Sequence, residues 1–307
     1  MPMHVHPDPV GLPSILTRQE ALEAGLSPDQ IRHRVRGGHW RALATGVYLR
    51  DPESQPDLDT FEGRHADHAR RAEAAQRARP DCVIGFGSAA VIHDLPLISG
   101  PPALVQLLVP DGTWTGIRGG VRYRECHLNA ADVDRGVIAV TNPTRTWIDV
   151  ARTHRLPDAL SVGDAGVRTG HLDVSEAAWT LKQLGSIRGV RLASAALLLL
   201  DGKRETALES WSLARFVEWD LPIPQFQVVF QDEVGFVARV DFYWPSGRVV
   251  GESDGQVKYQ TREVLYQEKR REDRLRALGL TVIRWGWTDL QQSGHALRTR
   301  LSAAVGR

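Results

Sequence analysis

The sequence has few cysteines and no long apolar run, and these absences exclude several classes of protein. Cys82 and Cys126 are the only cysteines among 307 residues, too few for a disulfide framework or a four-thiolate zinc site. No stretch approaches 18 apolar residues, and 1–13 has no signal-peptide pattern. The formal net charge is only +1, so any nucleic-acid-binding surface must be local. These features predict a cytoplasmic protein with no membrane partner.

The composition is that of a folded protein of more than one domain. Hydrophobic residues make up 42% and charged residues 24%, and nine tryptophans supply large apolar surfaces. A chain of this length predicts two or three domains. Composition shifts divide it into a disordered start (1–13), a helix-turn-helix unit (14–50), a linker (51–60), a middle domain (61–200) and a C-terminal domain (201–307). The fold class is therefore α+β, multidomain.

Helix-start signals mark two short helices in residues 14–50. Thr17 with Glu20 forms a capping-box pattern, and Ser27 followed by Pro28 starts a second helix that ends near Gly37. Two extended runs follow, 39–43 and 46–49. This order is typical of a winged helix.

Four arginines are candidates for DNA contact: Arg32, Arg34 and Arg36 on the second helix, and Arg41 at the start of the wing. Such a helix can enter a major groove while guanidinium groups reach phosphates and guanine edges. The alternative is a solvated basic face.

The middle domain mixes helix and strand and shows no catalytic constellation. Strands are expected at 104–109 and 121–126. His65 and His68 are read as solvated surface histidines, since no third metal ligand accompanies them. Ser88 and His93 lie near an aspartate, but no nucleophile-elbow pattern surrounds Ser88.

The C-terminal domain reads as helix, several strands, long helix, strand, helix, which predicts an α/β sandwich. Glu209 shares the packed face of the first helix, 205–219. If Ser246–Gly247 is the centre of a hairpin, residues whose numbers sum to 493 stand opposite each other. Asp241 then faces Glu252.

Opposed carboxylates on one face of a sheet are destabilising unless a cation compensates them. With Glu209 as a third ligand, Asp241 and Glu252 would form an oxygen-rich site suited to Mg²⁺ or Mn²⁺. The same register pairs Arg239 with Asp254 across the strands. The alternative is two surface carboxylates in a register shifted by one residue.

Three further charged residues that follow this pair in the sequence are candidates for the same site. Lys258 can swing back to position an attacking water, or it can be solvated. Glu268 and Arg271 interrupt the apolar stripe of the helix at 261–279. They form a mutually satisfied buried pair, or they contact the substrate phosphate and the metal-bound water.

The C-terminal domain resembles the PD-(D/E)XK nuclease superfamily, closest to its Vsr-like branch. The resemblance covers 205–290 and lies in Val240–Phe242, Val250–Tyr259, Glu268–Asp273 and Leu278–Trp285. It implies a restriction-endonuclease-like α/β/α fold and a Mg²⁺-dependent phosphodiesterase, with Asp241 and Glu252 as metal ligands and Glu209 as the first-helix glutamate. The usual lysine is replaced by Asp254, so either Lys258 has taken its role or activity is weakened or lost.

The front half resembles the AbiEi-like antitoxins of type IV toxin/antitoxin systems. The motifs are Leu16–Arg18 to Gly37–Gly38, Gly46–Tyr48, Ser88–Pro96 and Thr141–Trp147. The resemblance implies a winged-helix DNA-binding domain, a helical second domain, and a role in promoter autoregulation or phage defence.

Three functions are compatible with these features. The first is a DNA-targeted, metal-dependent endonuclease. The second is a transcriptional regulator or antitoxin whose nuclease fold is inactive. The third is a module that acts only in assembly with a toxin partner protein.

Overall fold

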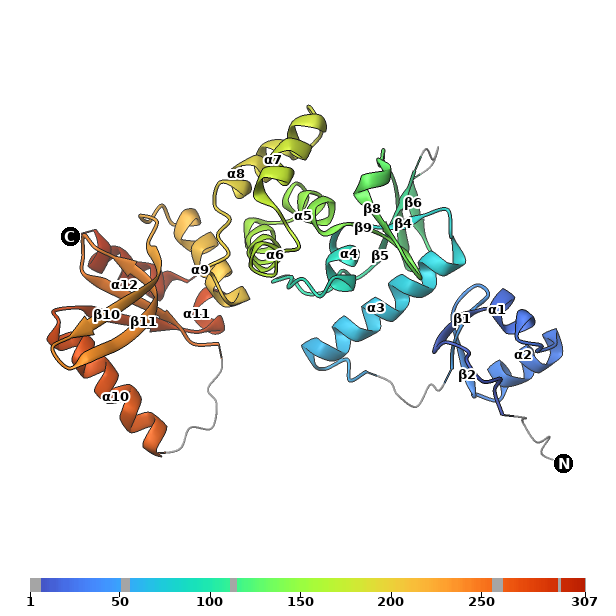
Figure 1. The fold of residues 1–307 in the computed structure, drawn as a ribbon, viewed down its shortest axis with the longest axis horizontal. Helices are drawn as coiled ribbons and strands as arrows, with labels where there is room; N and C mark the ends of the chain where they lie inside the picture. The colour runs from blue at the N-terminus through green and yellow to red at the C-terminus, as the bar shows by residue number, and fades with distance from the viewer. Residues whose placement is uncertain (1–6, 51–55, 111–114, 256–261, 292–293, 307) are drawn as a thin grey trace. The chain divides into compact units, whose positions relative to one another are not determined.

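The computed structural model describes residues 7–50, 56–110, 115–255, 262–291 and 294–306. The chain separates into two compact units, Met1–Val150 and Ala151–Arg307. In the described residues the protein is mixed α+β with three sheets (Figure 1). The five-part division expected from the sequence is finer than this separation and stays a prediction. None of the described helices is both long and apolar enough to cross a bilayer.

The first unit begins with the two helices and the hairpin expected for residues 14–50. They are β1 (Ile15–Thr17), α1 (Arg18–Glu23), α2 (Pro28–Arg36), β2 (Trp40–Ala44) and β3 (Val47–Arg50), with the strands in the order β1-β3-β2. Both helices start with a complete capping box. Thr17 bonds reciprocally with Glu20, and Ser27 with Gln30. The helix starts read from the sequence are thereby confirmed.

Asp8 fastens this small unit together. Its carboxylate accepts hydrogen bonds from Arg34 Nε at 2.8 Å, Trp40 Nε1 at 3.1 Å and Arg50 Nε at 2.7 Å. Burial acts to raise the pKa of Asp8, but these three donors outweigh it and hold the pKa below its usual value. Residues 1–13 were expected to be disordered, yet their described part contains the carboxylate that joins α2, β2 and β3. Residues 1–6 lie outside the described residues.

A six-stranded mixed sheet forms the rest of this unit. Its order is β6-β7-β5-β4-β9-β8, with β4 (Val83–Ile84), β5 (Val105–Val109), β6 (Gly116–Arg118), β7 (Val121–Glu125), β8 (Val133–Arg135) and β9 (Ala139–Thr141). The expected strands at 104–109 and 121–126 are β5 and β7. The others have two or three residues each, too short to show a periodic pattern. Three helices accompany the sheet: α3 (Phe61–Ala78), α4 (Phe86–Ile92) and α5 (Pro143–Ala151).

His68 lies inside this unit rather than on its surface, so the reading as a surface histidine was wrong. Its side chain is fully buried, and its Nε2 lies 2.8 Å from Ser88 Oγ. The Ser88 hydroxyl in turn accepts the backbone N–H of Gln106 at 2.9 Å. These bonds join α3, α4 and β5. Burial, with a smaller contribution from Arg71, lowers the pKa of His68 to about 4, so the imidazole is neutral at physiological pH.

The second unit contains a helical part followed by a four-stranded sheet. The helical part is α6 (Leu156–Arg168), α7 (Val174–Gln183) and α8 (Val190–Leu197). Then follow α9 (Ala207–Glu218), β10 (Gln225–Asp232), β11 (Gly235–Trp244), β12 (Val249–Ser253), α10 (Arg262–Ala277), β13 (Thr281–Trp285), α11 (Trp287–Gln291) and α12 (His295–Val305). The strand order is β10-β11-β12-β13, and only β12–β13 is parallel among these pairs. The predicted order of helices and strands is confirmed.

Helices cover both faces of this sheet (Figure 1). On one face Phe216 of α9 meets Phe242, Trp244 and Trp285 edge to face, with ring centroids 5.2 to 5.7 Å apart. On the other face Leu275 of α10 packs in a core cluster with strand residues. These aromatic contacts explain the glycine in β12, since a Cβ at Gly251 would lie 2.5 Å from the Trp285 ring.

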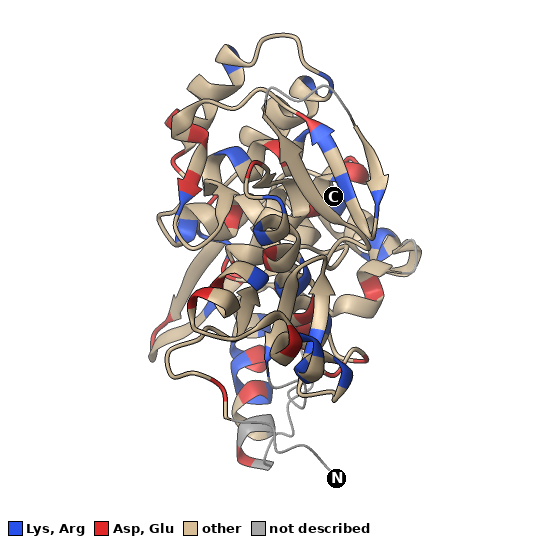
Figure 2. Ribbon diagram, turned by 90° about the vertical axis from the view of Figure 1, so that its right-hand side faces the viewer, with Lys and Arg blue, Asp and Glu red and all other residues tan. Residues whose placement is uncertain are grey.

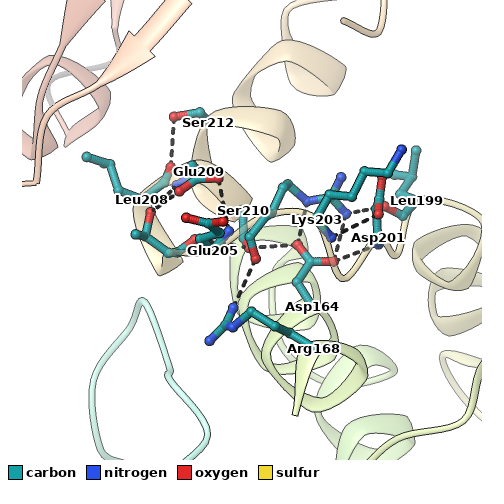
Figure 3. Close-up of polar contacts among 12 residues, drawn as sticks. Asp164, Arg168, Leu199, Asp201, Lys203, Glu205, Leu208, Glu209, Ser210 and Ser212 are labelled. Atoms are coloured by element: carbon teal, nitrogen blue, oxygen red, sulfur yellow. Dashed lines mark hydrogen bonds and ion pairs between the residues drawn. The ribbon is translucent and has the colours of Figure 1, made fainter. Parts of the chain in front are cut away.

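A buried ion pair fixes the start of α9 (Figure 3). Asp164 on α6 accepts Arg204 Nε at 2.6 Å and Nη2 at 2.7 Å, the Ser210 hydroxyl at 2.6 Å, and the backbone N–H of Asp201 at 3.0 Å. Both charged side chains are 1% exposed. A buried pair of this kind fixes geometry tightly, because removing either partner leaves an unpaired buried charge. The first turn of α9, and with it Glu209, is held in place.

Acidification is expected to test the buried state of His68. Because its folded pKa is about 4 against 6.5 in the unfolded chain, its contribution is complete above pH 6.5. It is lost as pH falls towards 4, a loss of about 3 kcal/mol at 1.36 kcal/mol per pKa unit. Urea unfolding of the wild type and His68→Gln should therefore show a stability difference that shrinks on acidification.

His295→Gln, at an exposed histidine on α12, serves as the control for the substitution itself, because it removes an imidazole that is not buried. An NMR titration that placed the His68 pKa near 6.5 would contradict the expectation.

Candidate functional site

Glu209 lies in the first turn of α9 as part of its N-terminal cap. Thr206 caps the helix, accepting the Glu209 N–H at 3.2 Å and donating its hydroxyl to Oε1 at 2.9 Å. The other oxygen accepts the Glu205 N–H (Figure 3) and Gln227 Nε2, both at 3.0 Å. The side chain is 4% exposed, as its position on the packed face predicts. Burial raises the pKa of Glu209, and the neighbouring Asp241 charge adds to the rise.

The hairpin register derived from the sequence is confirmed. Phe242 pairs with Gly251, Tyr243 with Val250 and Trp244 with Val249, so paired residue numbers sum to 493. Continued by one step beyond the last observed pair, this register would place Asp241 opposite Glu252. Asp241 Oδ2 accepts two hydrogen bonds from Ser253, from its N–H at 2.9 Å and its hydroxyl at 3.0 Å. The reading of the two carboxylates as neighbours on one face therefore rests on an observed register.

Glu252 is buried and held by two arginines. Its side chain is 6% exposed, Arg271 of α10 donates to Oε1, and Arg284 Nη2 of β13 lies 3.0 Å from Oε2. Burial raises the pKa of Glu252, the two guanidinium groups oppose that rise, and the Asp241 charge adds to it. The cation that the opposed carboxylates require is thus present as guanidinium.

The Asp241 charge acts on both glutamates, so the three predicted metal ligands belong to one electrostatic neighbourhood. Even so, among the residues that the structure describes, no group of three histidine, cysteine or acidic side chains is placed to hold a metal ion. The oxygen donors suit Mg²⁺ or Mn²⁺ by their chemistry. In the structure, however, Glu252 is bonded to Arg271 and Arg284. Metal binding therefore stays a prediction.

The ion pair expected between Arg239 and Asp254 is replaced by two others. Arg239 bonds to Glu205 at 2.9 Å rather than to Asp254. Asp254 lies instead 3.9 Å from Arg284. The reason is strand pairing: the ladder between β11 and β12 ends at Phe242, so Arg239 lies beyond it and bonds to Glu205, just before α9.

Glu268 and Arg271 do not form a buried pair with each other. Arg271 is taken by Glu252, and Glu268, one-third exposed, lies 3.8 Å from Arg284. Arg284, which the sequence pattern did not mark as a site residue, is the centre of this ion-pair network. The signal that reveals it is the parallel register of β12 with β13, in which Glu252 and Arg284 are direct partners. Lys258 lies outside the described residues.

The four arginines expected to contact DNA differ in exposure. Arg34 is 2% exposed, bonded to Asp8, with its guanidinium 5.6 Å from the Trp40 ring centroid, so this prediction is corrected. Arg32 and Arg36 are exposed on α2, Arg32 beside Asp29. Arg41 is partly exposed at the start of β2. The exposed basic face of α2 therefore consists of two arginines.

Comparison with known proteins finds relatives without assigned activity. No family model matches the chain. Two uncharacterized proteins of Mycobacterium tuberculosis, MT2308 of strain CDC 1551 and Rv2248 of strain H37Rv, are each 29% identical over 289 residues, covering 92% of this chain and 98% of theirs. The crystal structure of RV2827C from the same organism matches with a TM-score of 0.41 and 14% identity, covering 72% of this chain and 84% of that one. The two resemblances drawn from sequence motifs stay predictions.

Removing Arg271 tests whether the guanidinium groups neutralise Glu252. Arg271→Ala should lower the free energy of unfolding by about 1 to 2 kcal/mol, less than for a fully buried pair, because Arg284 remains and Arg271 is one-third exposed. Combining it with Glu252→Gln should recover most of that loss, since no unpaired carboxylate remains. Urea unfolding at pH 7 measures both.

Arg276→Ala on the same helix is the matched control, because its pair with Glu272 is exposed and worth at most about 0.5 kcal/mol. Equal losses in the two single variants would contradict the role assigned to Arg271.

Proposed function

We propose that this protein is a DNA-binding regulator of the antitoxin type, in which the nuclease-like sheet serves as a scaffold rather than a catalyst. The observation that carries the proposal is the engagement of Glu252 by Arg271 and Arg284. A catalytic metal would need this carboxylate as a ligand. Here two cations within the protein already satisfy it.

The sequence at the site supports the same conclusion. Catalysis in this superfamily, as the resemblance implies, uses a lysine two residues after the second acidic position. That position holds Asp254, which lies 3.9 Å from Arg284. A carboxylate there cannot supply the positive charge that a lysine would bring to the phosphate. The residues at the site therefore favour a structural role for the sheet over phosphodiester hydrolysis.

The DNA-binding face in this proposal is α2 with the β2–β3 hairpin. Arg32 and Arg36 are exposed on the helix, and the Asp8 contacts fix the helix against both strands. Basic and acidic residues are interspersed along the chain (Figure 2), consistent with a local basic face rather than a bulk field. Guanidinium groups on a rigid helix suit the major groove and its phosphates.

DNA binding can be measured by fluorescence anisotropy with a duplex from upstream of the protein's own reading frame. Replacing Arg32 and Arg36 with alanine should weaken binding by about tenfold or more, because each base or phosphate contact contributes about 1 to 3 kcal/mol. The salt dependence should flatten by about one unit of slope per lost phosphate contact.

Arg276→Ala, an exposed arginine on α10, should bind as the wild type does. If the double variant kept full affinity, α2 would not be the DNA-binding element.

The rival function is a metal-dependent endonuclease, favoured by the shared electrostatic neighbourhood of Glu209, Asp241 and Glu252. These three residues would hold Mg²⁺ or Mn²⁺, which when bound lowers the pKa of a coordinated water and stabilises charge on the phosphate. For that, Arg271 must release Glu252. The chain's own part would then be to align the carboxylates through the β11–β12 register and the fixed start of α9.

The regulator proposal predicts that purified protein does not nick supercoiled plasmid DNA with Mg²⁺ or Mn²⁺, and that Arg271→Ala does not unmask cleavage. Gel assays over a range of protein concentrations measure this. Cleavage that disappears in both Asp241→Ala and Glu252→Ala would overturn the scaffold proposal in favour of the endonuclease.

A further inference from the structure

The first unit contains a cavity of about 550 Å³ beside the β2–β3 hairpin. Three parts of the unit line it. They are the hairpin tip at 43–45, the C-terminal half of α3 with the residue that follows it (Arg71, Ala75, Ala78 and Arg79), and the sheet with its β6–β7 turn (Val105, Arg118–Val121 and Tyr123). The volume is within the range of about 300 to 1,000 Å³ that is usual for small-molecule sites. It shares only the hairpin tip with the proposed DNA-binding face, and none of its lining residues belongs to the acidic site.

The cavity combines three guanidinium groups with an apolar wall. Arg71 comes from α3 and Arg79 directly follows that helix, and each has an acidic neighbour, Asp67 at 2.9 Å and Asp81 at 3.3 Å. Arg118 is exposed, and no acidic side chain of the described residues forms an ion pair with it. The lining therefore carries a net positive charge.

The tight turn next to Arg118 leaves room for a ligand to approach the backbone. Gly119 and Gly120 have φ of +57° and +79°, the conformation of a two-residue hairpin loop of type I′. The space where a Cβ would stand is open at both positions. Backbone N–H groups in such a turn, together with arginine forks, are the donors that bind phosphate groups.

We propose that this cavity binds a small organic phosphate of about mononucleotide size. Arg118 contacts the phosphate with the help of Arg79 and Arg71, and the alanine and valine side chains pack against the organic part. An isolated inorganic ion would leave this apolar wall without contacts. A ligand that has both a negative charge and an apolar part matches this lining better than a bare phosphate does.

The position of the cavity connects such a ligand to the proposed DNA-binding face. Leu43, Ala44 and Thr45 line it, and the strand pairing shifts register between Ala42 and Ala44. A bulge of this kind re-aims the hairpin tip. A ligand that contacts the tip would therefore alter the affinity for DNA, a consequence that rests on the proposed function.

Calorimetric titration of the full chain with adenosine 5′-monophosphate, inorganic phosphate and adenosine tests the site without DNA. The monophosphate should bind, phosphate should bind more weakly and adenosine should not bind. Arg118→Ala should weaken monophosphate binding at least about tenfold, the effect of one lost charge-assisted hydrogen bond. Its melting temperature should equal that of the wild type, since Arg118 is exposed.

Arg122→Ala is the matched control. It removes the same charge from β7, next to Val121 and Tyr123 but on the opposite side of the strand. It should bind the monophosphate as the wild type does. No saturable binding of the monophosphate, or equal loss in both variants, would overturn the proposal.

DNA binding measured with and without saturating monophosphate tests the connection to the hairpin. A changed DNA affinity in the wild type, absent in Arg118→Ala, is expected. If the monophosphate does not bind but Arg118→Ala weakens DNA binding, the cavity holds a DNA phosphate and the small-ligand proposal is wrong. If the monophosphate binds while DNA does not bind at all, only the proposed function fails.

Discussion

The C-terminal unit depends on how it neutralises one buried carboxylate, Glu252. A glutamate almost removed from water needs a counter-charge, because an isolated buried ion is too costly to retain. Its neighbour across the strands, Asp241, makes the requirement stronger, since two opposed negative charges repel. The structure meets the requirement with Arg271 from the helix and Arg284 from the next strand. The crossover from β12 through α10 to β13 thus returns the chain with both counter-charges in place.

A second buried carboxylate, Asp164, does for the helical part what Glu252 does for the sheet. It binds Arg204 through two hydrogen bonds and also accepts from Ser210, so the segment before α9 and the helix itself are tied to α6. Glu209, one residue before Ser210, is consequently presented at the edge of the sheet near Asp241. The acidic neighbourhood is therefore assembled by contacts that lie outside it. Its geometry does not require a ligand to form.

The sequence predicted local features well and distant partners poorly. The helix starts at Thr17 and Ser27 and the hairpin register at Ser246–Gly247 follow from residues within a few positions of one another. The partners of Arg34 and His68 lie 26 and 20 residues away, at Asp8 and Ser88. The residue types of Arg34 and His68 alone indicate solvent exposure, because charged and polar residues are mostly found at the surface unless they are paired. Only the fold shows the pairing.

The same limit applies to Arg284, and it bears on function. Opposed carboxylates were read as requiring a divalent ion, which is correct about charge but leaves the identity of the cation open. Arg284 could be assigned only once β13 was known to run parallel to β12 with Glu252 as its partner. A metal ion at this point would have to displace Arg271 while Arg284 stayed fixed in the sheet beside it. The metal ion and Arg284 would then both contact the Glu252 carboxylate. Repulsion between these two positive charges opposes metal binding unless Asp241 and Glu209 neutralise most of the ion's charge.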